Sequence, residues 1–108
     1  MANAGPEVLS ALLSPRELIR LEKQARAEGA TALFFFGSRV RGDRRADSDL
    51  DVFVEYDRTI EGRFSLIELA TLKELIEEAT QTKVHITTRN SLDPEMRDHI
   101  EAEAIRVF

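Results

Sequence analysis

The sequence predicts a single layered domain of the α/β or α+β class, and three observations support this. Short apolar segments at 31–36, 49–56 and 83–88 alternate with amphipathic segments of helical period. A chain of 108 residues fits one compact domain. Apolar runs stay well short of the roughly 20 residues that span a bilayer. We therefore expect one domain over residues 1–108, with a loose or weakly helical arm over residues 1–12.

The clearest helix start is the run Ser14-Pro15-Arg16-Glu17. Ser14 can cap the helix, Pro15 suits the first helical position, and Glu17 completes a capping box. Gly29 supplies the stop, which predicts a helix over 15–28. A second helix is expected from Phe64 to Gln81, with an inward stripe of apolar residues: Leu66, Leu69, Leu72, Ile76 and Ala79.

The last part of the chain predicts one more helix and one more strand. Ser91-Leu92-Asp93-Pro94 resembles the first helix start, so a helix is expected to open there. Ile105 to Phe108 can close the chain as a short strand. The predicted order is therefore helix, strand, short helix, strand, helix, strand, helix and a terminal strand.

Two of the predicted strands differ in pattern. Residues 31–36 are apolar and aromatic and are bounded by glycines, which indicates a strand buried on both faces with its three phenylalanines in the core. In the segment 49–56, apolar and polar residues mostly alternate. Because side chains in a strand repeat every two residues, Asp49 and Asp51 must point to the same side.

Composition limits the classes of ligand and location. Lys and Arg number 15 against 20 Asp and Glu, which gives a net charge of -5. Nucleic-acid binding depends on basic side chains, so this balance argues against it. The absence of cysteine excludes disulfides and a thiol nucleophile. The first residues lack the pattern of a signal peptide, so a cytoplasmic location is expected and no membrane association.

The basic residues nevertheless gather in one segment, beside a turn suited to an anion. Gly37-Ser38 follows a predicted strand and opens a short helix, where unpaired N–H groups can bind phosphate. Four arginines lie within the next seven positions. Of these, Arg39 is the best candidate for phosphate binding, whereas Arg44 and Arg45 are expected to lie in a solvated loop.

Asp49 and Asp51 supply the second half of a candidate site. Two carboxylates on one side of a strand suit Mg²⁺, which binds one or two carboxylates together with substrate phosphates. Twin aspartates are unusual in a strand, because aspartate disfavours that conformation. A bound Mg²⁺, or alternatively Mn²⁺, would then align a nucleotide triphosphate with an acceptor hydroxyl.

With these residues in place, the sequence resembles the minimal nucleotidyltransferases of the DNA polymerase beta-like superfamily. The resemblance rests on Gly37-Ser38, ten intervening residues, and Asp49-Leu50-Asp51, with Ser48 completing a Ser-Asp-x-Asp form. It implies a nucleotidyltransferase fold, a mixed β-sheet backed by helices, and transfer of a nucleoside monophosphate from a nucleoside triphosphate to a hydroxyl. The residues it implies are Asp49 and Asp51 for catalysis and metal, and Gly37, Ser38, Arg39, Gly42 and Ser48 for the nucleotide.

One position departs from the family pattern. Many members place a third carboxylate where this chain has His85, in the run Lys83-Val84-His85-Ile86-Thr87. Imidazole is a poor ligand for Mg²⁺ but can bind softer metals. His85 could act as a neutral base or softer-metal ligand, two carboxylates could suffice, or the chain could bind nucleotide without turnover. The other histidine, His99, is expected at the surface.

The resemblance also bears on the partner. Small members of this family are often paired with a helical HEPN-domain protein, an RNase toxin, and act as its antitoxin. The sequence leaves no second domain to present an acceptor, so we expect transfer of AMP from ATP to a partner protein. The alternative is a catalytically impaired module that neutralises a partner by binding or senses nucleotide. The sequence leaves the formation of homo-oligomers open.

Overall fold

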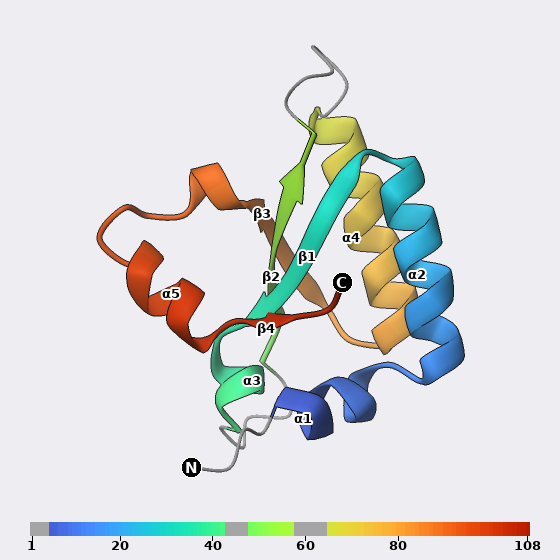
Figure 1. Ribbon diagram of the computed structural model, residues 1–108, viewed down its shortest axis with the longest axis horizontal. Helices are drawn as coiled ribbons and strands as arrows, with labels where there is room; N and C mark the ends of the chain where they lie inside the picture. The colour runs from blue at the N-terminus through green and yellow to red at the C-terminus, as the bar shows by residue number, and fades with distance from the viewer. Residues whose placement is uncertain (1–4, 43–47, 58–64) are drawn as a thin grey trace.

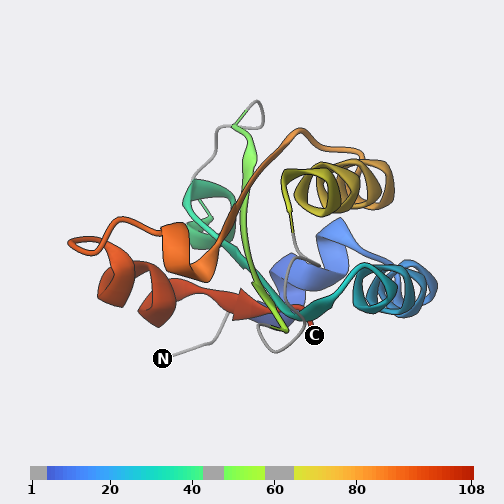
Figure 2. The ribbon, with the colours of Figure 1, turned by 90° about the horizontal axis from the view of Figure 1, so that it is seen from above.

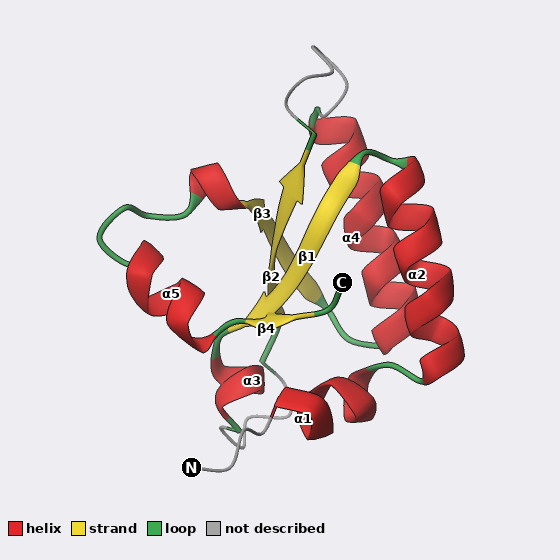
Figure 3. Ribbon diagram, in the orientation of Figure 1, coloured by secondary structure: helices red, strands yellow, loops and turns green. Residues whose placement is uncertain are grey.

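A four-stranded mixed β-sheet forms the centre of the computed structural model, which describes residues 5–42, 48–57 and 65–108. The strand order is β3-β2-β1-β4. β1 runs antiparallel to both of its neighbours, and β2 and β3 run parallel (Figures 1 and 3). The strands are β1 (Ala30–Phe36), β2 (Leu50–Tyr56), β3 (Val84–Thr88) and β4 (Ile105–Arg106). The predicted mixed sheet and terminal strand are thereby confirmed.

The helices divide between the two sides of this sheet. The two long helices cover one face, and the segment from η1 to α5 lies on the other side (Figure 2). The helices are α1 (Gly5–Leu12), α2 (Pro15–Ala27), α3 (Ser38–Arg41), α4 (Leu66–Thr80), the 3-10 turn η1 (Arg89–Ser91) and α5 (Arg97–Glu103). None of these described helices is long and apolar enough to cross a membrane.

Capping boxes begin both long helices. The Ser14 hydroxyl accepts the backbone N–H of Glu17, whose side chain returns to the Ser14 N–H, so the predicted start of α2 is confirmed. Ser65 and Glu68 form the equivalent box at the start of α4. Hydrogen bonds from Ser65 lower the pKa of the Glu68 carboxyl. Helix α4 begins at Leu66, two residues after the start that was predicted at Phe64.

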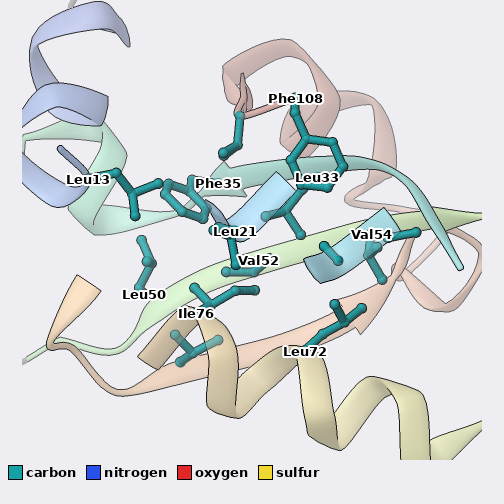
Figure 4. Close-up of a cluster of buried hydrophobic side chains, with 14 of the residues drawn as sticks. Leu13, Leu21, Leu33, Phe35, Leu50, Val52, Val54, Leu72, Ile76 and Phe108 are labelled. Atoms are coloured by element: carbon teal, nitrogen blue, oxygen red, sulfur yellow. The ribbon is translucent and has the colours of Figure 1, made fainter. Parts of the chain in front are cut away.

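The hydrophobic core lies between the sheet and the two long helices. Alternate residues of β2 face the helices and are fully buried, together with residues of β1 and of both helices (Figure 4). The largest contributors are Leu21, Leu33, Phe35, Leu50, Val52, Val54, Leu72 and Ile76. Since residues of one parity in β2 fill this core, residues of the other parity, including Asp51, point to the opposite face.

Strand β1 was expected to be buried on both sides, but on the opposite face of the sheet it is only partly buried. Phe35 is fully buried, but Phe34 and Phe36 are only half-buried. The ring of Phe34 stacks on that of Phe53 at 4.6 Å between centroids, and the Arg89 guanidinium lies 5.9 Å from each of these two ring centroids. The second face is therefore covered partly by an arginine and by α5 instead of by a complete helical layer.

Two further predictions need correction. Leu66 was assigned to the inward stripe of α4, but it is 82% exposed because it lies in the first turn of the helix. The last helix begins at Arg97, not at Pro94, because Asp93 accepts the N–H groups of Glu95 and Met96 in a preceding turn.

Of the two alternatives for the first residues, a loose or a weakly helical arm, the described part is helical. It forms α1, which packs against the core.

Candidate active site

The candidate site lies where β1 ends and β2 begins. Because these strands are antiparallel, Phe36 at the end of β1 pairs with Asp51 near the start of β2. β3 runs parallel to β2 and places His85 opposite Asp51. Three strands thus bring the predicted turn at Gly37, the carboxylate of Asp51 and the imidazole of His85 to one end of the sheet.

Gly37 leaves room for the Asp51 carboxylate. A Cβ atom added at Gly37 would lie 2.1 Å from Oδ2 and 3.0 Å from Cγ of Asp51. The backbone of Gly37 also has φ 85° and ψ -163°, a conformation that is essentially restricted to glycine. Steric contact and backbone conformation therefore both require glycine at this position.

The turn itself is one short helix with glycine at each end. The N–H groups of Val40 and Arg41 donate to the Gly37 carbonyl, each at 3.1 Å, and Gly42 ends the helix in the left-handed conformation with φ 83°. A Cβ atom at Gly42 would meet no described atom within 4 Å. Gly42 is thus needed for its backbone conformation, whereas Gly37 is needed for conformation and space.

Arg39 connects the turn to the aspartate segment. Its Nη1 donates to the Ser48 carbonyl at 3.2 Å, directly before Asp49 in the chain. The structure thereby brings together the predicted nucleotide-binding residues Gly37, Ser38, Arg39, Gly42 and Ser48 in one region. Arg44 and Arg45, predicted to lie in a solvated loop, fall outside the described residues.

The electrostatics of Asp51 suit a bound cation. Burial raises the pKa of the Asp51 carboxyl, and the charge of Asp49 raises it further, while His85 and Arg41 oppose these effects. The Asp51 side chain is 31% exposed, and Asp49 is exposed. A divalent cation bound between the two carboxylates would offset the cost of burying the Asp51 charge and the repulsion between the two aspartates. The two carboxylates therefore fit the metal that the sequence pattern implies.

The ligand set for that metal is small. Within the part of the chain that the structure describes, no three acidic or imidazole side chains converge to hold a metal ion. Mg²⁺ commonly binds one or two carboxylates and completes its coordination with water and substrate phosphates. Two aspartates are consequently sufficient for that mode of binding.

His85 lies next to Asp51, on the neighbouring strand β3. Its Nδ1 is 3.5 Å from Oδ1 of Asp51, and its side chain is 72% exposed. An imidazole at this distance can accept a proton near the carboxylate or donate a hydrogen bond to it. His99 is also exposed, at 66%, in agreement with its predicted surface position.

Sequence reasoning missed Glu103. Its Oε1 accepts the Gly37 backbone N–H at 3.1 Å, and its carboxylate pairs with the Arg41 guanidinium at 3.2 Å. Glu103 lies 66 residues after Gly37, and no local pattern links the two positions. The contact depends on the pairing of β4 with β1, which only the folded sheet reveals.

A small mixed sheet with a Gly-Ser turn packed against a strand aspartate is the arrangement that the sequence pattern of a nucleotidyltransferase predicts. Comparison with known families agrees: residues 19–108 match the family described as polymerase beta, nucleotidyltransferase. This match covers most of the chain, so the protein belongs to that family. Members of the family use a nucleoside triphosphate and a divalent metal.

Individual relatives agree with this assignment. The chain is 37% identical over 80 residues to "Putative protein adenylyltransferase MJ0435" of Methanocaldococcus jannaschii, covering 74% of this chain and 82% of the relative. A solved structure described as a "putative minimal nucleotidyltransferase" has a TM-score of 0.67 and 33% identity, covering 83% of this chain and 88% of that chain.

A third comparison concerns the fold alone. The solved complex of a tri-AMPylated Shewanella oneidensis HEPN toxin with an MNT antitoxin matches with a TM-score of 0.56 and 15% identity. The match covers 86% of this chain and 70% of that chain. At this identity the likeness shows a shared nucleotidyltransferase fold.

The close contact between Gly37 and Asp51 predicts how substitutions at the two glycines of the turn change the free energy of unfolding. Gly37→Ala should lower the free energy of unfolding by about 1–3 kcal/mol for the backbone strain alone, and more because the new Cβ overlaps the carboxylate. Gly42→Ala, with a left-handed backbone but open space, should cost only about 1–2 kcal/mol. Urea denaturation of the three proteins measures both costs.

A double-mutant cycle separates the carboxylate from the backbone. In an Asp51→Ala background, Gly37→Ala should be less destabilising by about 0.5–3 kcal/mol, since the overlapping atoms are gone. Strict additivity of the two substitutions would show that the carboxylate does not pack against Gly37 in solution.

Proposed function

We propose that this protein transfers AMP from ATP to a hydroxyl group of a partner protein. The observation that carries the proposal is the packing of the Asp51 carboxylate against Gly37, at the start of the Gly-Ser turn. Membership of the nucleotidyltransferase family supports the reaction class. The name of the relative from M. jannaschii, a protein adenylyltransferase, supports ATP as donor and protein as acceptor.

The proposed roles follow the geometry. Asp49 and Asp51 hold the metal, and the turn from Gly37 to Gly42 together with Ser48 binds the nucleotide. Asp49 and Asp51 would hold Mg²⁺, or Mn²⁺ as the alternative, and the bound ion would supply neutralisation of phosphate charge. The Gly-Ser turn would present its backbone to the phosphates. A side chain at Gly37 would collide with the Asp51 carboxylate and so displace the turn from the metal-binding residue.

The proposed step is a substitution at the α-phosphorus of ATP. The acceptor hydroxyl oxygen forms a bond to the α-phosphorus as the bond to the bridging oxygen of the β-phosphate breaks, and pyrophosphate leaves with that electron pair. The hydroxyl proton passes to the Asp51 carboxylate or to His85, whose Nδ1 lies 3.5 Å from Asp51 Oδ1. The remaining binding groups position the reactants.

We further propose a HEPN-domain toxin as the acceptor. The net charge of -5 argues against a nucleic-acid acceptor, because phosphate backbones attract basic proteins. The fold is shared with an MNT antitoxin that forms a complex with a tri-AMPylated HEPN toxin. In this proposal the protein is the antitoxin, and it inactivates its partner by covalent modification.

A labelling experiment tests this function. The protein is incubated with a HEPN-domain protein from the same genome and ATP labelled at the α-phosphate, in Mg²⁺ and separately in Mn²⁺. Label should appear on the partner. The Asp49→Asn/Asp51→Asn variant should lose about 100-fold or more of the rate, because metal binding supplies several kcal/mol of transition-state stabilisation.

The matched control is Asp98→Asn, which removes a carboxylate from an exposed position on α5 and should label at the wild-type rate. Absence of label from the wild-type protein in both metals would contradict the enzymatic function. Label that persists in the double variant would contradict the assigned site.

The position of His85 favours a second candidate function. A histidine stands beside Asp51 where many family members carry a carboxylate, and it cannot supply negative charge to a metal. In this alternative the protein binds nucleotide or the partner at the same site without transfer. Neutralisation of the partner would then need binding alone.

Substitution of His85 tests whether the histidine limits transfer. If the missing carboxylate limits the metal site, His85→Asp should raise the Mg²⁺-dependent labelling rate about tenfold, equivalent to ~1.4 kcal/mol. His85→Asn has nearly the same size as aspartate without the charge and should not raise the rate. A rate in His85→Asp that equals or falls below that of the wild type would show that His85 does not limit catalysis.

A further inference from the structure

Glu103 holds the Gly-Ser turn from the far end of the chain. The Glu103 side chain is only 15% exposed, and both of its oxygens are used. Oε1 accepts the Gly37 N–H at 3.1 Å and an Arg41 N–H at 3.3 Å, while Oε2 accepts from Arg41 Nη1 at 3.2 Å. One carboxylate therefore contacts both the first residue of the turn and the last residue of α3.

The surrounding fold fixes the position of Glu103. Glu103 is the last residue of α5. The N–H of the next residue, Ala104, donates to the Ile100 carbonyl and caps the end of the helix. Ile105 then pairs with Phe35 of β1, close to where β1 passes into Gly37 (Figure 1). The register of β4 on β1 thus sets where the Glu103 carboxylate meets the turn.

A second anchor holds α5 on the sheet. Glu101, two residues before Glu103, accepts Arg89 Nε at 2.7 Å, and Arg89 also pairs with Glu55 of β2. The Arg89 guanidinium lies over the Phe53 ring. The helix that carries Glu103 is consequently tied to β2 through Arg89, which supports the position of the largely buried Glu103 carboxylate.

We infer that Glu103 is a positioning residue for the nucleotide-binding turn. This inference rests on the proposed function. Glu103 orients the Gly37 amide and the Arg41 guanidinium, and so holds the turn in the geometry that receives the triphosphate. It needs no contact with the nucleotide, because it acts through Gly37 and Arg41.

Removal of Glu103 would have the opposite effect on nucleotide affinity if its carboxylate occupied the place of a phosphate oxygen. A carboxylate bound to a backbone N–H and a guanidinium resembles a bound phosphate in its contacts. In that case its removal would free both groups and strengthen nucleotide binding. The sign of the change in affinity therefore decides between support and competition.

The test measures binding of a non-hydrolysable ATP analogue with Mg²⁺ by calorimetry. Glu103→Ala should raise Kd about tenfold, the scale of a lost charge-assisted hydrogen bond. Glu103→Gln should fall between the wild type and Glu103→Ala, since its amide oxygen still accepts the Gly37 N–H but cannot pair with Arg41. The exposed control Glu95→Gln should bind like the wild type.

A nucleotide-free measurement tests the contact by itself. The Gly37 amide resonance in an NMR spectrum of the wild-type protein should move in Glu103→Gln and stay unchanged in Glu95→Gln. Adding Arg41→Ala should abolish most of the further effect of Glu103→Ala on Kd, because the two residues act together. A merely structural role would lower the melting temperature without this coupling, and that result would overturn the inference.

The binding experiment distinguishes a failure of the proposed function from a failure of the role inferred for Glu103. If the wild-type protein does not bind the analogue, the proposed function falls and this inference with it. If the wild-type protein binds and the Glu103 variants bind equally well or more tightly, the inference alone is overturned. Should Glu103→Ala fail to fold, Glu103→Gln keeps the side-chain volume and carries the same test.

Discussion

The contact of the Asp51 carboxylate with the backbone of Gly37 is the constraint on which the rest of the site depends. It requires the antiparallel register that pairs Phe36 with Asp51, and it requires a residue without a side chain at Gly37. A metal held by Asp51 would therefore lie beside the Gly-Ser turn, because the strand register sets their positions.

The two faces of the sheet divide stability from chemistry. One face packs against α2 and α4 and contains the buried aliphatic residues, so it supplies most of the hydrophobic stabilisation. The other face carries Asp51 and is only partly covered. There Arg89 joins β2 to α5 through Glu55 and Glu101, and α5 in turn places Glu103 on the turn. The functional face is thus held by charged pairs at its rim and remains open at the carboxylates.

Sequence reasoning predicted the local features of this protein well, because they depend on short-range rules. The Gly-Ser turn was expected from its position after β1, and Ser38 begins α3 there. The strand predicted over 49–56 begins at Leu50, so Asp49 precedes it, and the common side of Asp49 and Asp51 stays a prediction. Periodicity cannot tell which face of the sheet lacks a helical layer, so the partial exposure of Phe34 and Phe36 was missed. The capping box at Ser65 had a local signal that was not used. Glu103 had none, because its contact arises from strand pairing.

Paramagnetic broadening by Mn²⁺ tests whether the carboxylate beside Gly37 binds the metal. In an NMR titration with Mn²⁺, the amide signals of Gly37, Asp51 and His85 should lose intensity first, and Asp51→Asn should remove this effect. Loss of intensity centred instead on the acidic outer surface of α4, around Glu74 and Glu78, in both proteins would show that Asp51 does not bind the metal.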